Sequence, residues 1–235
     1  SDKHSTIAAY LITNHGRATP LVWKTFADAE LTEGGRTDAE DTLLLRIQEV
    51  MPHGVRVILL ADRGLGDVGL YEMLDRWGWD YVVRFRQDIH VTSAAGETKP
   101  AREWLSPKGH SKAMRGALVT AKQYEVGAVV TVHAPGMKDS WCLATSLSDK
   151  TARDVVDLYA RRFTIEETFR DQKDPRFGLG MRHTRVASAE RRDRLLLLAA
   201  LAQALLTLLG AAGERCGLDR GLKPNTSKKR SLSLF

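Results

Sequence analysis

Residues 55–64 read VRVILLADRG, and this stretch decides the fold of the chain. Its first seven residues, 55–61, form a nearly continuous aliphatic run of strand length, which is typical of a central strand covered on both faces. The run ends at Asp62-Arg63-Gly64. Because helical patterns precede and follow it, the stretch predicts a mixed α/β domain built around a buried strand.

The elements ahead of this strand extend the pattern. Two short runs rich in β-branched and aromatic residues, 6–13 and 18–26, are separated by the turn sequence NHGR at 14–17. They predict a β-hairpin. Apolar residues then recur at helical spacing after Thr37, which predicts a helix that ends before Pro52.

Strands and helices also alternate after the central run. Asp67 caps a predicted helix that continues to Trp77, and residues 80–86 return as a strand. Residues 87–147 contain short β-like segments between turn-forming breaks, which predicts a mostly β insertion. Two final helices are predicted, at 151–173 and 189–209.

Composition narrows the class of protein. The chain has 235 residues, of which 43% are hydrophobic, so it has enough apolar material for a buried core. Its formal net charge of +6 favours a polyanionic partner. Two distant cysteines, Cys142 and Cys216, do not support a disulfide framework or a cysteine-based zinc site. The polar opening has no signal-peptide pattern, so we expect a cytoplasmic protein.

The apolar stretch 195–213 is about long enough to span a bilayer. Gln203, Thr207 and several alanines and glycines lower its hydrophobicity. We therefore expect a core helix packed on a sheet, in preference to a membrane span.

The helix predicted at 151–173 carries the most informative polar pattern. Four side chains are spaced by 3, 4 and 7 residues and fall within roughly 60° on a regular helix: Tyr159, Arg162, Glu166 and Lys173. We expect Glu166 to border the core and Thr168 to lie on the solvated side. A carboxylate among cations and a phenol suits a phosphodiester site, in which the acid binds a divalent metal and the cations hold phosphate. An ordinary ion pair between Arg162 and Glu166 explains the same spacing.

Asp62 supports the phosphodiester interpretation. An acid directly after a buried strand points into the crevice where α/β proteins bind ligands, although a turn or cap aspartate has the same position. If Asp62 and Glu166 meet, they form the core of a site for Mg²⁺ or Mn²⁺ ions about 4 Å apart.

These residues resemble a known family. The pattern Y159-x2-R162-x3-E166-x6-K173 resembles the Tyr-Arg-Glu-Lys signature of bacterial insertion-sequence DDE transposases, and LLADRG at 59–64 is similar to their second-aspartate strand. HGRATPLVW at 15–23, the β insertion and the leucine-rich final helix are also similar to that family. The resemblance implies a ribonuclease-H-like α/β fold, a mixed sheet flanked by helices. Its parts would be 1–86 (first part of the core), 87–147 (β insertion) and 148–235 (helical second part).

The resemblance also implies roles for residues. Asp62 and Glu166 would be catalytic acids that bind Mg²⁺ or Mn²⁺, and Tyr159, Arg162 and Lys173 would hold DNA. Trp141 would stack on a base flipped out at the transposon end, although a tryptophan in the core of the insertion fits the sequence equally well. Such enzymes cut DNA at transposon ends and join it to target DNA, generally as homodimers on paired ends.

One feature departs from the family. The first catalytic aspartate should lie on a strand ahead of Thr6, and the sequence shows no such strand. Asp2 is the only acid before Asp28, and we do not assign it. We expect this chain to be an excerpt of a complete enzyme or the product of a truncated reading frame. A catalytically inactive remnant that only binds DNA is the alternative function.

A second alternative is a dinucleotide-binding protein. Residues 64–69 fit G-x-G-x-x-G after a strand and before a helix, with Arg84 or Arg86 placed for a 2′-phosphate. Asp62 and Asp67 would then face the pyrophosphate, which weakens this interpretation. The sequence contains no Walker-type loop and no serine nucleophile elbow, so ATPase and serine hydrolase functions are excluded.

Overall fold

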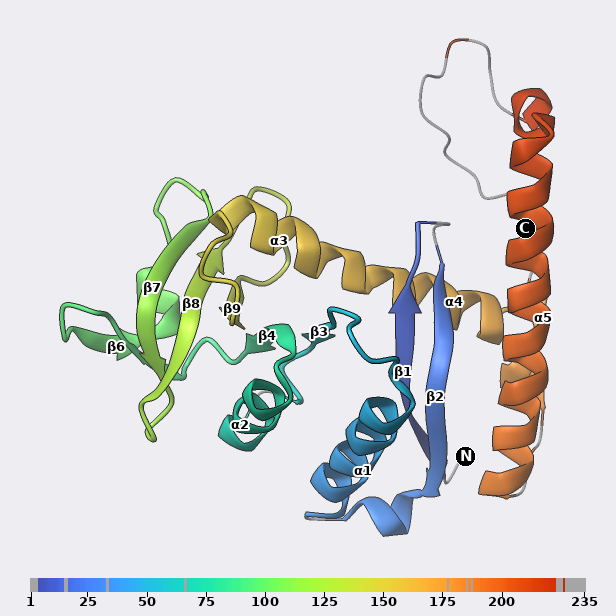
Figure 1. Cartoon of the computed structure of the whole chain (residues 1–235), viewed down its shortest axis with the longest axis horizontal. Coiled ribbons are helices and arrows are strands. Elements are labelled where there is room, and N and C mark those ends of the chain that lie inside the picture. The colour runs from blue at the N-terminus through green and yellow to red at the C-terminus, as the bar shows by residue number, and fades with distance from the viewer. Residues whose placement is uncertain are drawn as a thin grey trace. The chain divides into compact units, whose positions relative to one another are not determined.

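The chain forms two compact units, one made of residues 1–50 and 163–235 and the other of residues 51–162. The computed structural model (Figure 1) describes the following residues: 4–14, 17–32, 34–65, 67–176, 178–184, 186, 188–222 and 226. Each unit has its own sheet. The division at 1–86, 87–147 and 148–235 remains a prediction.

The first unit begins with the predicted hairpin. Strands β1 (His4–Ile12) and β2 (Ala18–Ala27) pair antiparallel, and residues 15 and 16 of the turn lie outside the described residues. A 3-10 turn, η1 (Asp28–Leu31), leads into helix α1 (Gly35–Val50). Leu43, Leu44 and Ile47 of α1 are buried, as their helical spacing predicts.

The other helices of this unit are α4 (Thr164–Lys173), η4 (Met181–His183), α5 (Ala189–Arg215) and η5 (Leu218–Leu222). Two of them are fixed to the start of β2. The backbone N–H of Ala18 donates to Thr168 Oγ of α4 at 3.0 Å, and Gln203 Nε2 of α5 donates to the Ala18 carbonyl at 2.9 Å. Ala18 is fully buried, so these bonds satisfy backbone groups that water does not reach.

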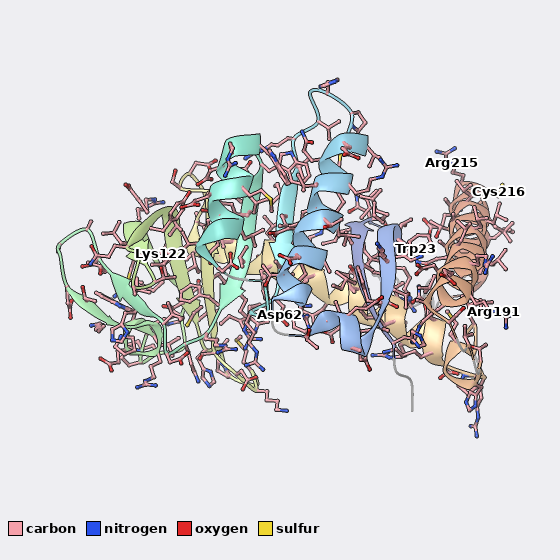
Figure 2. All side chains as sticks on the ribbon, turned by 90° about the horizontal axis from the view of Figure 1, so that it is seen from below. Trp23, Asp62, Lys122, Arg191, Arg215 and Cys216 are labelled. Atoms are coloured by element: carbon pink, nitrogen blue, oxygen red, sulfur yellow. The ribbon has the colours of Figure 1, made fainter. Side chains whose placement is uncertain are left out.

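Helix α5 differs in part from the expectation of a core helix. It packs along β2, where Asp193 accepts a hydrogen bond from the Thr25 N–H at 3.3 Å. Arg191 and Arg215 mark its two ends (Figure 2). Leucines on its other faces are exposed, such as Leu205 at 67% and Leu209 at 69%. The reason is that a two-stranded sheet covers one side of a helix that is apolar all round. By length and composition alone, α5 also meets the requirement for crossing a membrane.

The second unit is built on one seven-stranded mixed sheet. Its spatial order is β3-β4-β9-β8-β7-β5-β6, and only β3 and β4 are parallel. The strands are β3 (Ile58–Ala61), β4 (Asp80–Phe85), β5 (His90–Thr92), β6 (Thr98–Pro100), β7 (Lys112–Val119), β8 (Tyr124–Val132) and β9 (Trp141–Thr145). The insertion is mostly β, as predicted, with one 3-10 turn, η2 (Ala101–Trp104). This mixed α/β architecture confirms the expected fold class and is consistent with a ribonuclease-H-like fold.

Strand β3 corrects one prediction. It is shorter than the aliphatic run, and among the residues that the structure describes it forms the edge of the sheet and does not take a central place. Helix α2 (Val68–Trp77) connects it to β4, and Asp67 caps α2 by accepting the Leu70 N–H at 2.8 Å, as predicted. Ala61 is buried and Ile58, Leu59 and Leu60 are half-buried, which one covered face of an edge strand explains.

The helix predicted at 151–173 is interrupted. Helix α3 (Ala152–Ala160) is followed by a 3-10 turn, η3 (Arg161–Phe163), before α4 begins. A 3-10 turn has about 3.0 residues per turn where an α-helix has about 3.6, so the regular angular spacing that placed four polar residues on one stripe does not continue across it. The boundary between the two units also falls here, between Arg162 and Phe163. Tyr159 and Arg162 therefore belong to one unit, and Glu166 and Lys173 to the other.

Candidate functional site

Asp62 directly follows β3, at the end of the sheet where the parallel strands β3 and β4 both finish (Figure 2). The register pairs Ala61 with Val83, so Asp62 lies level with the next residue of β4, Arg84. The Arg63 N–H donates to Asp62 Oδ1 at 2.8 Å, and the Leu65 N–H donates to its carbonyl at 3.0 Å. This turn holds the carboxylate in a fixed place while 45% of the side chain stays exposed.

Three side chains from distant parts of the second unit surround this carboxylate. Arg84 Nη1 lies 3.8 Å from Oδ1, and Arg162 Nη2 lies 3.8 Å from Oδ2. Tyr159 Oη donates a hydrogen bond to Oδ1 at 3.3 Å. The two guanidinium groups, each about one seventh exposed, bring two positive charges to one acid. Two of the four residues of the predicted pattern, Tyr159 and Arg162, thus meet Asp62.

Tyr159 is anchored by packing. Its ring is fully buried in a core cluster with Val82, Val130 and Leu143, and only its hydroxyl reaches Asp62. Burial raises the pKa of Tyr159 to about 12. The phenol therefore stays protonated near neutral pH and remains a hydrogen-bond donor to the carboxylate.

Trp141 is the first residue of β9 and is half-buried. Its ring meets the Tyr159 ring edge to face, with centroids 5.0 Å apart. Through this contact Trp141 packs against the core cluster that contains Tyr159. Stacking of Trp141 on a flipped base remains a prediction.

Glu166 and Lys173 lie at opposite ends of α4 in the first unit, and both side chains are exposed. The expectation that Glu166 borders the core is wrong, and so is the placement of Thr168 in solvent, since Thr168 is 1% exposed. The buried side of α4 is set by the hydrogen bonds between Thr168 and Ala18 on β2. Because the Thr168 hydroxyl is hydrogen-bonded, its burial does not carry the free-energy cost of an unpaired polar group.

Asp62 supplies carboxylate oxygens of the kind that Mg²⁺ prefers, but one acid flanked by two cations does not by itself make a divalent metal site. Within the described ranges, no three His, Cys, Asp or Glu side chains cluster closely enough to hold a metal. Asp62 and Glu166 belong to separate units, so their meeting at one metal site stays a prediction.

Sequence reasoning had assigned Arg84 only to the dinucleotide alternative. The parallel register of β3 and β4, which places it at Asp62, is not visible in the sequence. Its position between Val83 and Phe85, two buried residues of β4, was the available signal. The structure also counts against a dinucleotide, because the Asp67 carboxylate occupies the N-terminus of α2 where a pyrophosphate would bind. Gly66 of that motif lies outside the described residues.

Comparison with known protein families identifies the chain's family. A family model described as "Transposase DDE domain" matches residues 24–203, about three quarters of the chain. The matched range contains Asp62, both parts of the interrupted helix and the whole β insertion. No curated protein matches the chain.

Proposed function

We propose a function from one premise: this chain belongs to the Transposase DDE domain family. Membership implies a role in transposition and binding to DNA, and such transposases generally use divalent metals. We propose more specifically that the chain is the catalytic domain of a bacterial insertion-sequence transposase of the Tyr-Arg-Glu-Lys type. It cuts DNA at the ends of the element in the bacterial cytoplasm and joins the freed ends to target DNA, as a homodimer on paired ends.

The convergence of Tyr159, Arg162 and Arg84 on Asp62 carries this proposal. Asp62 is 97 residues away from Tyr159 in the sequence. Tyr159 and Arg162, two residues of the predicted pattern, contact Asp62 directly after β3. A shared phosphodiester site requires side chains from both segments to lie together. A solvated surface ion pair would not need a fully buried tyrosine to support it.

The residues have separate roles in this proposal. Asp62 and Glu166 would hold Mg²⁺ or Mn²⁺, which would supply an activated water and neutralise charge on the phosphate. Arg162 and Lys173 hold phosphate oxygens of the DNA strand. Tyr159 keeps the Asp62 carboxylate in place through its hydroxyl. Trp141 stacks on an unpaired base near the cut.

Strand β3 offers a place for a third acid. Within the part of the chain that the structure describes, β3 pairs on one side only. A strand that carries an aspartate and adds to the open edge of β3 would bring that acid next to Asp62. We propose that a strand of this kind supplies the third acid, and nicking by a chain extended ahead of Ser1 tests it.

Nicking of supercoiled plasmid DNA in Mg²⁺ or Mn²⁺ tests the function. We expect the upstream-extended chain to nick DNA, and we expect Asp62→Asn and Glu166→Gln each to lower the rate by a factor on the order of 10² or more. Glu167→Gln is the matched control, because Glu167 is adjacent but pairs with Arg170 at 2.9 Å, and its nicking rate should remain near that of the parent.

Two results would overturn the catalytic proposal. One is nicking that survives Glu166→Gln. The other is an extended chain that binds DNA in EDTA but never nicks it, which would leave the DNA-binding remnant as the function.

A further inference from the structure

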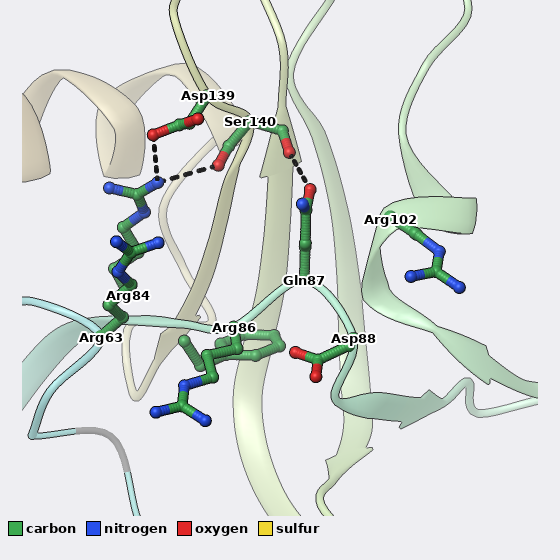
Figure 3. A pocket seen from close by; sticks show the side chains of 9 residues that line it. Arg63, Arg84, Arg86, Gln87, Asp88, Arg102, Asp139 and Ser140 are labelled. Atoms are coloured by element: carbon green, nitrogen blue, oxygen red, sulfur yellow. Dashed lines mark hydrogen bonds and ion pairs between the residues drawn. The ribbon is translucent and has the colours of Figure 1, made fainter.

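A pocket of about 250 Å³ lies beside Asp62 in the second unit (Figure 3). Four arginines line it and come from three segments: Arg63 from the loop after β3, Arg84 and Arg86 from the end of β4, and Arg102 from η2. Two acids, Asp88 and Asp139, also line it. The side chains that line the pocket therefore carry a net charge of +2.

The four cations are not equally engaged with protein acids. Arg84 lies 3.8 Å from Asp139 and 3.8 Å from Asp62, so this one side chain contacts both the pocket and the candidate metal acid. Among the described residues, Arg63, Arg86 and Arg102 have no ion-pair partner within 4.0 Å, and all three are exposed. Three guanidinium groups thus remain available for an anion from solvent.

The backbone around the pocket is held rigidly. The Arg102 N–H donates to the Gln87 carbonyl at 2.9 Å, which ties η2 to the segment after β4. Ser140 Oγ donates to Gln87 Oε1 at 2.8 Å, and Arg84 Nη2 donates to the Ser140 carbonyl at 3.3 Å. Trp104 anchors η2 in the core, since it is 6% exposed. The backbone segments that carry the cations are therefore held together.

The size of the pocket limits its ligand. At about 30 Å³ per water molecule, 250 Å³ corresponds to roughly eight waters, enough for a phosphate group with part of its sugar. The rest of a nucleic acid lies outside a space of this size. The ligand chemistry that fits is one backbone phosphate of a DNA strand.

We propose that this arginine pocket binds a backbone phosphate of a DNA strand, next to the phosphate that is processed at Asp62. Arg63, Arg86 and Arg102 contact the phosphate oxygens. Arg84 positions the Asp62 carboxylate and the bound phosphate, because it contacts Asp62 and also lines the pocket. This inference rests on the proposed function for the identity of the strand, but the pocket and its charge do not depend on catalysis.

Binding of a labelled oligothymidine of about 12 nucleotides to the full chain in EDTA tests the pocket. We expect Arg86→Gln/Arg102→Gln to weaken binding on the order of tenfold or more. The dependence of log K on log salt should become shallower by about 0.7 for each lost phosphate contact. Arg86→Lys/Arg102→Lys should keep the salt dependence and recover part of the affinity, since lysine keeps the charge without the planar fork.

Arg46→Gln/Arg153→Gln is the matched control. It removes the same two charges from exposed helix surfaces, where Arg46 pairs with Glu49 at 2.8 Å and Arg153 with Asp157 at 3.8 Å. A loss of affinity equal to that of the pocket variant would overturn the proposal, because net charge alone would then explain binding. Unchanged binding by the pocket variant would also overturn it.

Two further probes separate the possible ligands. A methylphosphonate oligonucleotide, which has no backbone charge, should bind the parent and the pocket variant equally. Inorganic phosphate at constant ionic strength should compete poorly; strong competition would assign the pocket to a free anion and overturn the DNA proposal. Because all of these measurements are made without metal, pocket-dependent binding by a chain that never nicks DNA would refute the catalytic function and leave the pocket standing.

Discussion

Replacing Tyr159 with phenylalanine removes one hydroxyl from a ring that is fully buried. The lost interaction is the hydrogen bond to Asp62 Oδ1, which at 3.3 Å is long. Asp62 is 45% exposed, so water replaces the donor at its carboxylate. We therefore expect the free energy of unfolding to fall by only about 0.5–1.5 kcal/mol, the net value of an ordinary hydrogen bond.

Tyr159→Ala is the comparison that makes this value informative. Alanine also removes the ring that packs against Trp141 and the core cluster of Val82, Val130 and Leu143. Deleting a buried aromatic ring leaves a cavity, so we expect a loss of about 3–5 kcal/mol. The difference between the two variants separates the packing of the ring from its polar contact with the site.

Urea unfolding followed by tryptophan fluorescence measures both losses. Four of the five tryptophans lie in the same unit as Tyr159: Trp77, Trp79, Trp104 and Trp141. If Tyr159→Phe cost as much as Tyr159→Ala, the hydroxyl and not the packing would hold this residue. If Tyr159→Ala cost less than about 1 kcal/mol, the ring would not belong to the core. Either result would refute the reasoning that Tyr159 supports Asp62 from a fixed position.

Three other predictions follow from single features of the structure. Thr168→Val leaves the buried N–H of Ala18 without its acceptor and should cost about 1–3 kcal/mol in urea unfolding, whereas Thr168→Ser should restore most of that loss. Gly127→Ala places a methyl 2.4 Å from the Ser146 carbonyl oxygen and should cost about 1–3 kcal/mol, whereas Gly221→Ala, with nothing within 4 Å, should stay within about 0.5 kcal/mol. Burial raises the pKa of every tyrosine in the chain: Tyr10, Tyr71, Tyr81, Tyr124 and Tyr159. Each folded pKa lies above the unfolded value near 10, so this contribution to stability is complete below pH about 10 and is lost as pH rises further; ultraviolet titration that shows free tyrosinate before unfolding would contradict it.

The candidate site was predictable only in part. The residue types and spacing of Tyr159 and Arg162 identified them, and the acid after an aliphatic run identified Asp62. Arg63, Arg86 and Arg102 could not be gathered into one pocket from the sequence, because they follow different strands and turns. Arg84 is level with Asp62 only through the register of two parallel strands, and register is a property of the sheet.

The sequence by itself determined the local elements of this protein. Hydrophobic periodicity located the hairpin, α1, α2, β4 and the β insertion, because side-chain spacing along one segment reports which of its faces is buried. Caps were equally local: Asp67 accepts a hydrogen bond from a residue three positions later.

Only the tertiary structure decided which elements are neighbours. The aliphatic run at 55–61 predicted burial, but an aliphatic pattern does not distinguish packing against a helix from a place between two strands, so the edge position of β3 was not encoded locally. The burial of Thr168 depends in the same way on its hydrogen bonds with Ala18 of β2, far away in the chain. Tyr159 meets Asp62 because folding brings together residues 97 positions apart, which no local pattern contains.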